Sequence, residues 1–232
     1  MSQLNKESNL YTLGFLAIMA VIVAVVLAFL AKGLEPTIKK NQEFDRKSKI
    51  VMAIFPGQDL DKERINAEYE KIDARLMDHE GTILTEEIPA DFDYRVETKK
   101  PVEEMRLPVY VYDAEETAYV LQMTGMGLWD EISGYIALQD DKKTIRGVAF
   151  DHKGETPGLG AEIVKEWFET QFVGKQLFKD GEFNFTVYKA GKYDGSEYAV
   201  DGVSGATITT DGVDAMIEST VGNYSTFLNT RS

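Results

Sequence analysis

The longest apolar run of the chain lies near its start. Leu10 to Ala31 contains no charged residue, and as a helix it would be about 33 Å long, which matches the hydrocarbon thickness of a bilayer. A cleaved signal peptide is the alternative, but its apolar region usually spans only about 7 to 15 residues, and no Ala-x-Ala cleavage site follows this run. We therefore predict an uncleaved transmembrane helix over residues 10–31, after a tail over residues 1–9.

Charged and apolar residues are mixed at helical spacing in the next segment. Thr37 to Ile54 predicts a helix that ends before the Pro56-Gly57 pair. The stretch from Asp61 to Met77 predicts one amphipathic helix, because four apolar residues recur on one helical face: Ile65, Tyr69, Ile72 and Leu76.

Polar and proline-containing sequence follows that predicted helix. Asp78 to Gly81 predicts a turn, and the acidic stretch from Thr85 to Glu104, with its two prolines, predicts a loop. Residues 32–104 should thus form a stalk and an amphipathic helical region.

From Leu107 onward the apolar pattern changes to short runs rich in β-branched and aromatic residues. Five such runs predict the strands of one sheet: Leu107–Tyr112, Ala118–Met123, Tyr135–Leu138, Ile145–Phe150 and Phe183–Tyr188. Helical spacing over Ala161–Phe172 and Asp211–Leu228 predicts two helices. The expected fold class is α+β, an N-terminal transmembrane helix followed by a twisted antiparallel sheet domain with packed helices over residues 105–229.

The composition of the chain argues against several kinds of partner and site. Residues 51–232 carry 18 Lys or Arg and 35 Asp or Glu, so a nucleic acid is not an expected partner. The chain has no cysteine, which excludes disulfides, iron–sulfur ligation and thiol catalysis. His79 and His152 are its only histidines and lie far apart, so we expect no metal site. Asp140-Asp141 fits a hairpin turn.

A group of small residues and hydroxyls lies where the last helix should begin, in Asp201-Gly202-Val203-Ser204-Gly205-Ala206-Thr207-Ile208-Thr209. The first amides of a helix lack partners within it and attract anions, so this segment is suited to a phosphate. A simpler interpretation is that Ser204 or Thr207 is the N-cap of the helix.

Two glycine-rich segments precede this one, Gly125-Met126-Gly127-Leu128-Trp129 and Gly154-Glu155-Thr156-Pro157-Gly158-Leu159-Gly160. Neither completes the dinucleotide fingerprint, and each taken singly is typical of a turn. Residues 202–206 resemble a nucleophile elbow, but no histidine follows them, which argues against an α/β-hydrolase.

Taken in order, the three segments resemble those of the C subunit of the sodium-translocating NADH:quinone oxidoreductases, and the anchor and the chain length agree. The resemblance implies an FMN-binding domain over residues 105–229, with FMN joined through its phosphate to Thr207. Trp129 and Leu159 would enclose the flavin ring. The remaining implied contacts are a loop shaped by Glu155, Thr156, Gly158 and Gly160, backbone offered to the phosphate by Ser204, Gly205 and Ala206, and a phosphate counter-charge from Lys189. A solvated lysine at a strand end is the alternative for Lys189.

The resemblance also implies a role and a location. The domain would relay electrons between centres in partner subunits, ending at the flavin of the B subunit, and would be inactive alone. A flavin transferase using FAD would attach the cofactor, and the chain would be a single-pass protein of the bacterial inner membrane, in contact with lipid. The family pattern places the domain in the periplasm, whereas Lys32, Lys39 and Lys40 after the span place it in the cytoplasm by the positive-inside rule.

Two alternatives from the sequence remain open. The G flavin subunit of the ferredoxin:NAD oxidoreductase complex shares the threonine motif and the Glu-Thr-Pro-Gly loop. A membrane-anchored binding module without cofactor would use the same fold.

Overall fold

A computed structural model describes residues 9–89, 92–114 and 116–229 of the chain. It divides into two compact units, residues 1–46 and residues 47–232. Helix α1 (Asn9–Ile54) continues through Pro36, so the helices predicted over residues 10–31 and 37–54 are one helix. It is long and apolar enough to cross a membrane.

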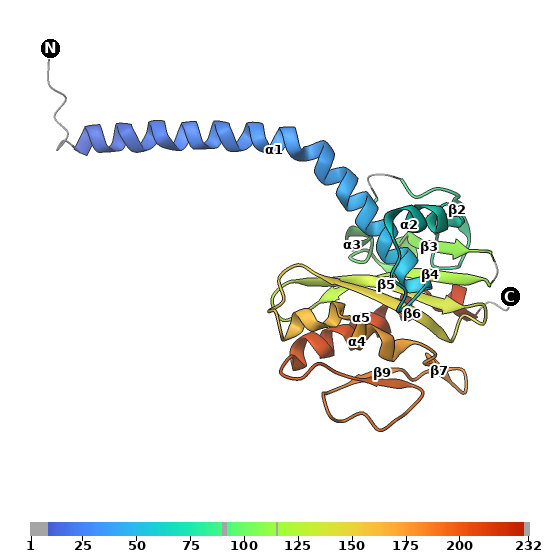
Figure 1. Ribbon diagram of the computed structural model, residues 1–232. Helices are drawn as coiled ribbons and strands as arrows, with labels where there is room; N and C mark the ends of the chain where they lie inside the picture. Colours follow the sequence, from blue (N-terminus) through green and yellow to red (C-terminus); the bar gives the residue numbers. More distant parts are fainter. Residues whose placement is uncertain (1–8, 90–91, 115, 230–232) are drawn as a thin grey trace, which may run out of the picture. The chain divides into compact units, whose positions relative to one another are not determined.

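The second unit is built on a six-stranded antiparallel sheet with the order β2-β1-β3-β4-β5-β6 (Figure 1). Its strands are β1 (Ile72–Met77), β2 (Ile83–Thr85), β3 (Leu107–Tyr112), β4 (Ala118–Met126), β5 (Glu131–Gln139) and β6 (Ile145–His152). β4 and β5 pair along their whole length, from Ala118↔Gln139 to Met126↔Glu131. The turn that joins them therefore projects from one end of the sheet.

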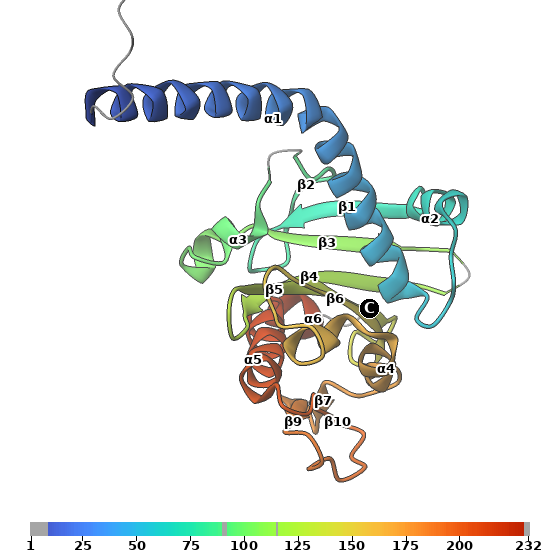
Figure 2. The same ribbon diagram turned by 60° about the vertical axis from the view of Figure 1, so that its left-hand side comes forward.

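The central strands β4 and β5 bury side chains on both faces of the sheet. Successive side chains of a strand point to opposite sides, so each face needs its own cover. Helix α5 (Thr207–Asn223) covers one face, over Leu121 and Met123, and residues 50–54 at the end of α1 cover the other, over Val120. Figure 2 shows the sheet between these elements. This arrangement confirms the predicted α+β class.

The predicted helix over Asp61–Met77 is wrong beyond Tyr69. Helix α2 spans only Lys62–Tyr69, and the residues after it form β1, where Ile72 pairs with Tyr112 and Leu76 with Pro108. A separation of four residues keeps two side chains on one face of a helix and also on one face of a strand. The spacing of Ile72 and Leu76 therefore could not distinguish the two structures.

Two other predicted elements are broken in the structure. The helix expected over Ala161–Phe172 consists of a 3₁₀ turn (Gly160–Val164), helix α4 (Glu166–Glu169) and a second 3₁₀ turn (Thr170–Phe172), with extended backbone at Lys165. The strand expected over Phe183–Tyr188 is divided between β8 (Glu182–Phe183) and β9 (Thr186–Tyr188), which pair with β7 (Phe178–Lys179) and β10 (Ala199–Asp201) outside the main sheet. In each case the apolar side chains are largely buried, but the backbone is irregular.

The remaining segments lie close to expectation. The turn over residues 78–81 is confirmed, with Gly81 at a φ of +84°, and Asp141 accepts the amides of Lys143 and Thr144 in the β5–β6 turn. The expected loop after Thr85 contains α3 (Tyr94–Glu97) and a 3₁₀ turn (Val102–Glu104). The last predicted helix begins four residues earlier, as α5, and is followed by α6 (Ser225–Asn229).

Candidate functional site

The three glycine-containing segments, far apart in the sequence, meet at the N-terminal end of α5. A side chain at Gly212 in α5 would collide with the carbonyl of Met126 at the end of β4, and one at Gly205 would come within 2.8 Å of Leu159. The β4–β5 turn, the loop after β6 and the turn before α5 are thus packed closely together. Glycines allow this close approach because they have no Cβ.

Glu155 joins these segments by hydrogen bonds. It is 5% exposed, its Oε1 accepts the amide of Trp129 at 2.9 Å, and its Oε2 accepts the hydroxyl of Thr209 at 2.6 Å. Burial raises the pKa of this carboxyl, but the bonds from Thr209 and from the amides of Trp129, Asp130 and Leu128 outweigh burial and hold the pKa below its usual value. The carboxylate is therefore ionised at neutral pH.

The turn before α5 leaves the helix start open. Gly205 adopts a φ of +74°, and the first helical hydrogen bond runs from the amide of Thr210 to the carbonyl of Ala206 at 2.9 Å. Ala206 occupies the N-cap position without a side-chain cap, and Thr207 is the first helical residue. The interpretation of Ser204 or Thr207 as the N-cap is therefore wrong.

This open helix start is suited to an anion. The amides of residues 207–209 have no acceptor within a helix that begins at Thr207. Ser204, Gly205 and Thr207 are exposed around them, and Thr210 braces the turn from inside by accepting the amide of Val203 at 3.1 Å. A phosphate could approach these amides with the Thr207 hydroxyl beside it.

Exposed apolar side chains come from the same three segments. Trp129 is 68% exposed and Leu159 is 41% exposed. Met126, Leu128 and Ile208 are exposed as well. A group of exposed apolar residues marks a binding surface on a soluble domain, and an indole offers a flat face to a planar ring.

The other residues predicted for the site have distinct settings. The Thr156 carbonyl accepts the amides of Leu159 and Ala161, both at 3.1 Å, and so closes the turn in which Gly158 adopts a φ of +77°. A Cβ at Gly160 would collide with Glu155 and lie 2.6 Å from the Thr209 hydroxyl oxygen. These loop residues are brought together around Glu155.

Lys189 is not joined to this group by a contact. It is exposed just after β9, and among the described residues its side chain forms no hydrogen bond or ion pair. The neighbouring strand β10 leads into the turn before α5, with Asp201 paired to Tyr188. Lys189 thus lies near the strand that leads to the motif.

Sequence reasoning passed over several residues of this site. Thr209 is the hydroxyl partner of Glu155, and its position two residues after Thr207 in the motif was the available signal. Gly127 and Gly212 matter through close backbone approach, which depends on the tertiary structure alone. Within the described residues, no three His, Asp or Glu side chains are grouped as metal ligands.

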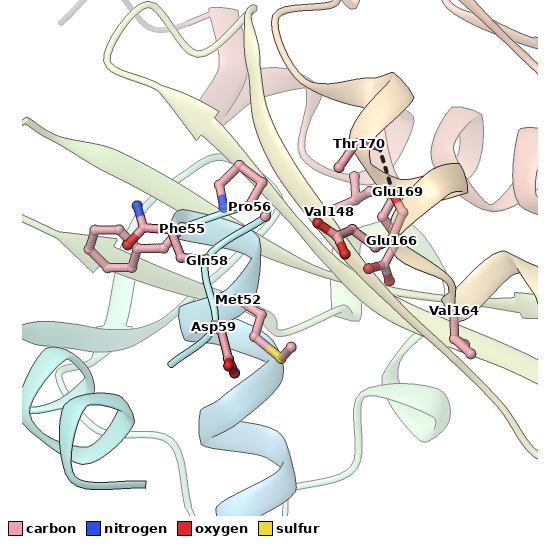
Figure 3. A pocket seen from close by; sticks show the side chains of 11 residues that line it. Met52, Phe55, Pro56, Gln58, Asp59, Val148, Val164, Glu166, Glu169 and Thr170 are labelled. Carbon is pink, nitrogen blue, oxygen red and sulfur yellow. Dashed lines mark hydrogen bonds between the residues drawn. The ribbon is translucent and has the colours of Figure 1, made fainter. Parts of the chain in front are cut away.

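A separate cavity of about 480 Å³ lies in the second unit (Figure 3). It is lined by residues 55–59 after α1, by Val148 of β6 and by the carboxylates of Glu166 and Glu169 in α4. None of the predicted site residues lines it, so the exposed surface at the start of α5 remains the candidate site.

Comparisons with known proteins show which family this chain resembles. The FMN-binding domain family matches residues 127–222. This range contains the second and third segments entirely and the first from Gly127 onward. The C subunit of the Na(+)-translocating NADH-quinone reductase of Neisseria meningitidis is 30% identical over 197 residues, which cover 77% of this chain and 76% of the relative. The chain belongs to the C-subunit family of these reductases.

A second relative and a solved structure extend the comparison. The C subunit from Haemophilus ducreyi is 31% identical over 198 residues, covering 77% of this chain and 76% of its own. The crystal structure of the C subunit from Parabacteroides distasonis has a TM-score of 0.76 and 33% identity, and the match covers 86% of this chain and 98% of that one. The antiparallel sheet of this chain excludes the Rossmann and α/β-hydrolase folds.

Proposed function

We propose that this chain carries FMN, joined by a phosphoester to Thr207, as an electron-transfer subunit of a sodium-translocating NADH:quinone oxidoreductase. The observation that carries the proposal is the helix start at Thr207, where an exposed hydroxyl lies next to uncapped amides. Membership of the C-subunit family and the match to the FMN-binding domain family support the choice of cofactor.

The residues of the site fit such a group. Gly205 in its left-handed conformation leads into a helix start at which Ala206 occupies the cap position, and no side chain caps the amides of residues 207–209, which suits a phosphate. Trp129 and Leu159 offer the apolar surfaces for the ring, and the loop of Glu155, Thr156, Gly158 and Gly160 supports them. Bound FMN supplies reversible electron acceptance and donation, while the protein supplies position and surroundings.

Attachment requires a second enzyme. In this attachment the Thr207 hydroxyl would be the nucleophile toward the phosphorus of the FMN half of FAD, AMP would be the leaving group, and the hydroxyl proton would pass to a base. The carboxylates nearest to Thr207 in the sequence are Asp201 and Asp211. Both oxygens of Asp201 accept the amide of Gly191, at 2.8 and 3.0 Å, and Asp211 is an exposed residue of α5. A separate flavin transferase therefore provides the base and binds FAD.

The complex provides the partners and the place. One partner subunit delivers electrons to this domain, and the domain passes them to the flavin of the B subunit. Helix α1 anchors the chain in the lipid of the bacterial inner membrane. We place the domain on the periplasmic side because the family pattern implies it. The lysines after the span point to the cytoplasm by the positive-inside rule, but assembly with other subunits can override that bias. The span over residues 10–31 contains no acidic residue, so sodium crosses through other subunits.

Intact mass of the full-length chain, co-expressed with a flavin transferase, tests the proposal. The wild type should gain the mass of one FMN minus water, Thr207→Ala should lack that mass, and Ser204→Ala, which removes a neighbouring exposed hydroxyl, should keep it. Modification that persists in Thr207→Ala would move the linkage elsewhere. A wild type without flavin fluorescence after denaturation would favour the binding module without cofactor.

Membership of the C-subunit family argues against the G flavin subunit of the ferredoxin:NAD oxidoreductase complex, which the sequence alone had left open. The Gly-Met-Gly-Leu-Trp segment and the long region before residue 105 favour the sodium pump over it. NADH-dependent reduction of a quinone by the co-purified complex decides between the two, because the alternative complex exchanges electrons between NAD and ferredoxin rather than with a quinone.

A further inference from the structure

We infer that Glu155 is a positioning residue, whose buried carboxylate fixes the turn bearing Trp129 to the first turn of α5 and sets the electrostatic surroundings of the flavin without touching it. The inference rests on the proposed function for the flavin. The fixed turn itself can be tested without any cofactor.

The contacts of Glu155 leave it little capacity to bind a ligand. The residue is 5% exposed, and its two oxygens are engaged with different segments, Oε1 with the amide of Trp129 and Oε2 with the hydroxyl of Thr209. The partners lie 26 residues before it and 54 residues after it. Glu155 is therefore a bridge between the segment proposed to hold the ring and the one proposed to hold the phosphate.

The space around the carboxylate is matched to its size. A Cβ at Gly127 would lie 2.5 Å from Oε1, and a Cβ at Gly160 would collide with Oε2. Two glycines thus make room for a glutamate at this position. The side chain of aspartate is one methylene shorter, so its carboxylate cannot reach the Trp129 amide and the Thr209 hydroxyl without a shift of the backbone.

Charge is the second part of the inference. Amide donors and a hydroxyl donor surround the carboxylate, and they stabilise its ionised form. A fixed negative charge beside the site opposes the addition of electrons to a bound flavin. Replacing Glu155 by the isosteric Gln should therefore raise the midpoint potential of the flavin.

The first experiment measures the fixed turn without flavin. The chain contains two tryptophans, Trp129 and Trp167, so Trp167→Phe leaves Trp129 as the only one, and Thr207→Ala keeps the protein unmodified. In this background, Glu155→Asp and Thr209→Val should each lower the fluorescence anisotropy of Trp129, with Thr209→Val giving the smaller change. Glu162→Gln alters a carboxylate whose partner in the wild type is Trp167 rather than the Trp129 turn, and this partner is already absent from the Trp167→Phe background, so the substitution should change nothing.

The second experiment uses the holoprotein with Thr207 present, after intact mass has verified the modification. Glu155→Gln should keep the flavin and show a more positive midpoint potential, whereas Glu162→Gln should match the wild type. An unmodified wild type would refute the proposed function and, with it, the electrostatic part of the inference. Unchanged Trp129 anisotropy in both Glu155→Asp and Thr209→Val would overturn the positioning role, and an unchanged potential in modified Glu155→Gln would overturn the electrostatic role.

Discussion

Phe150 donates its backbone amide to Oε1 of Glu169 across 2.7 Å, so that a partly buried carboxylate of α4 holds the strand that leads into the candidate site. Burial raises the pKa of Glu169 to about 7, against the opposing effects of the Phe150 amide and the Lys49 ammonium and with a contribution from Glu166. The carboxyl thus retains its proton in the folded protein at pH values where the unfolded chain has lost it.

This raised pKa makes stability depend on pH. The stabilisation from protonated Glu169 is fully present below pH 4.5, the usual value, and is lost as pH rises through about 7. Glu169→Gln keeps an oxygen for the Phe150 amide without the charge, so it should raise the free energy of unfolding at pH 8.5 by about 1 to 2 kcal/mol. Urea unfolding at pH 5 and pH 8.5 measures the difference. Glu182→Gln, at an exposed position of β8 (Glu182–Phe183), serves as control. An equal effect of Glu169→Gln at both pH values would contradict the assignment.

Gly160→Ala should destabilise the domain by about 1 to 3 kcal/mol, because the added methyl collides with Glu155 and crowds Thr209. Gly154→Ala is a matched control in the same loop, since its methyl would lie 3.5 Å from the nearest atom, the Cβ of Asp130. Urea denaturation of both variants gives the comparison. Equal stability of Gly160→Ala and wild type would show that the backbone of this loop is free to shift.

Trp129→Ala should change the fluorescence of the attached flavin without changing the stability of the domain. The indole is exposed and the Glu155 bond uses the backbone amide of Trp129, so the free energy of unfolding should stay within about 0.5 kcal/mol of wild type. Flavin attached to this variant should fluoresce more strongly, because an aromatic neighbour no longer packs against the ring. Phe168→Ala, which removes a fully buried ring, should instead lose about 3 to 5 kcal/mol of stability. Quenched flavin in Trp129→Ala would argue that another side chain packs on the ring.

The side of the membrane occupied by the domain can be read by thiol labelling, since the chain has no cysteine. Lys192→Cys introduces one thiol at an exposed position of the loop after β9. A membrane-impermeant maleimide should label it in intact spheroplasts that contain the assembled complex. Labelling only after the membrane is permeabilised would place the domain in the cytoplasm, as the positive-inside rule predicts.

Some elements follow from the sequence because local pattern and tertiary structure agree. β3 spans Leu107–Tyr112 as predicted, since its run of β-branched and aromatic residues is buried on both faces. The uncharged run from Leu10 to Ala31 requires no tertiary partner to form a helix. The three glycine-rich segments were likewise recognisable by residue type and order, and so was the family to which the chain belongs.

Tertiary contacts decided the elements for which the local pattern is ambiguous. Ile72 and Leu76 suit a helix and a strand equally, and pairing with β3 selected the strand. The cap of α5 is Ala206 rather than a hydroxyl residue, because the turn from Val203 is braced by Thr210 from within the helix.

The bridge made by Glu155 between the Trp129 turn and Thr209 is the clearest case of a feature that only the tertiary structure decides. The sequence supplied the three residues and their types, but their hydrogen bonds join segments 26 and 54 residues apart. Only the packing of α5 against the end of β4 brings such distant groups within bonding distance, because hydrogen bonds are short and directional.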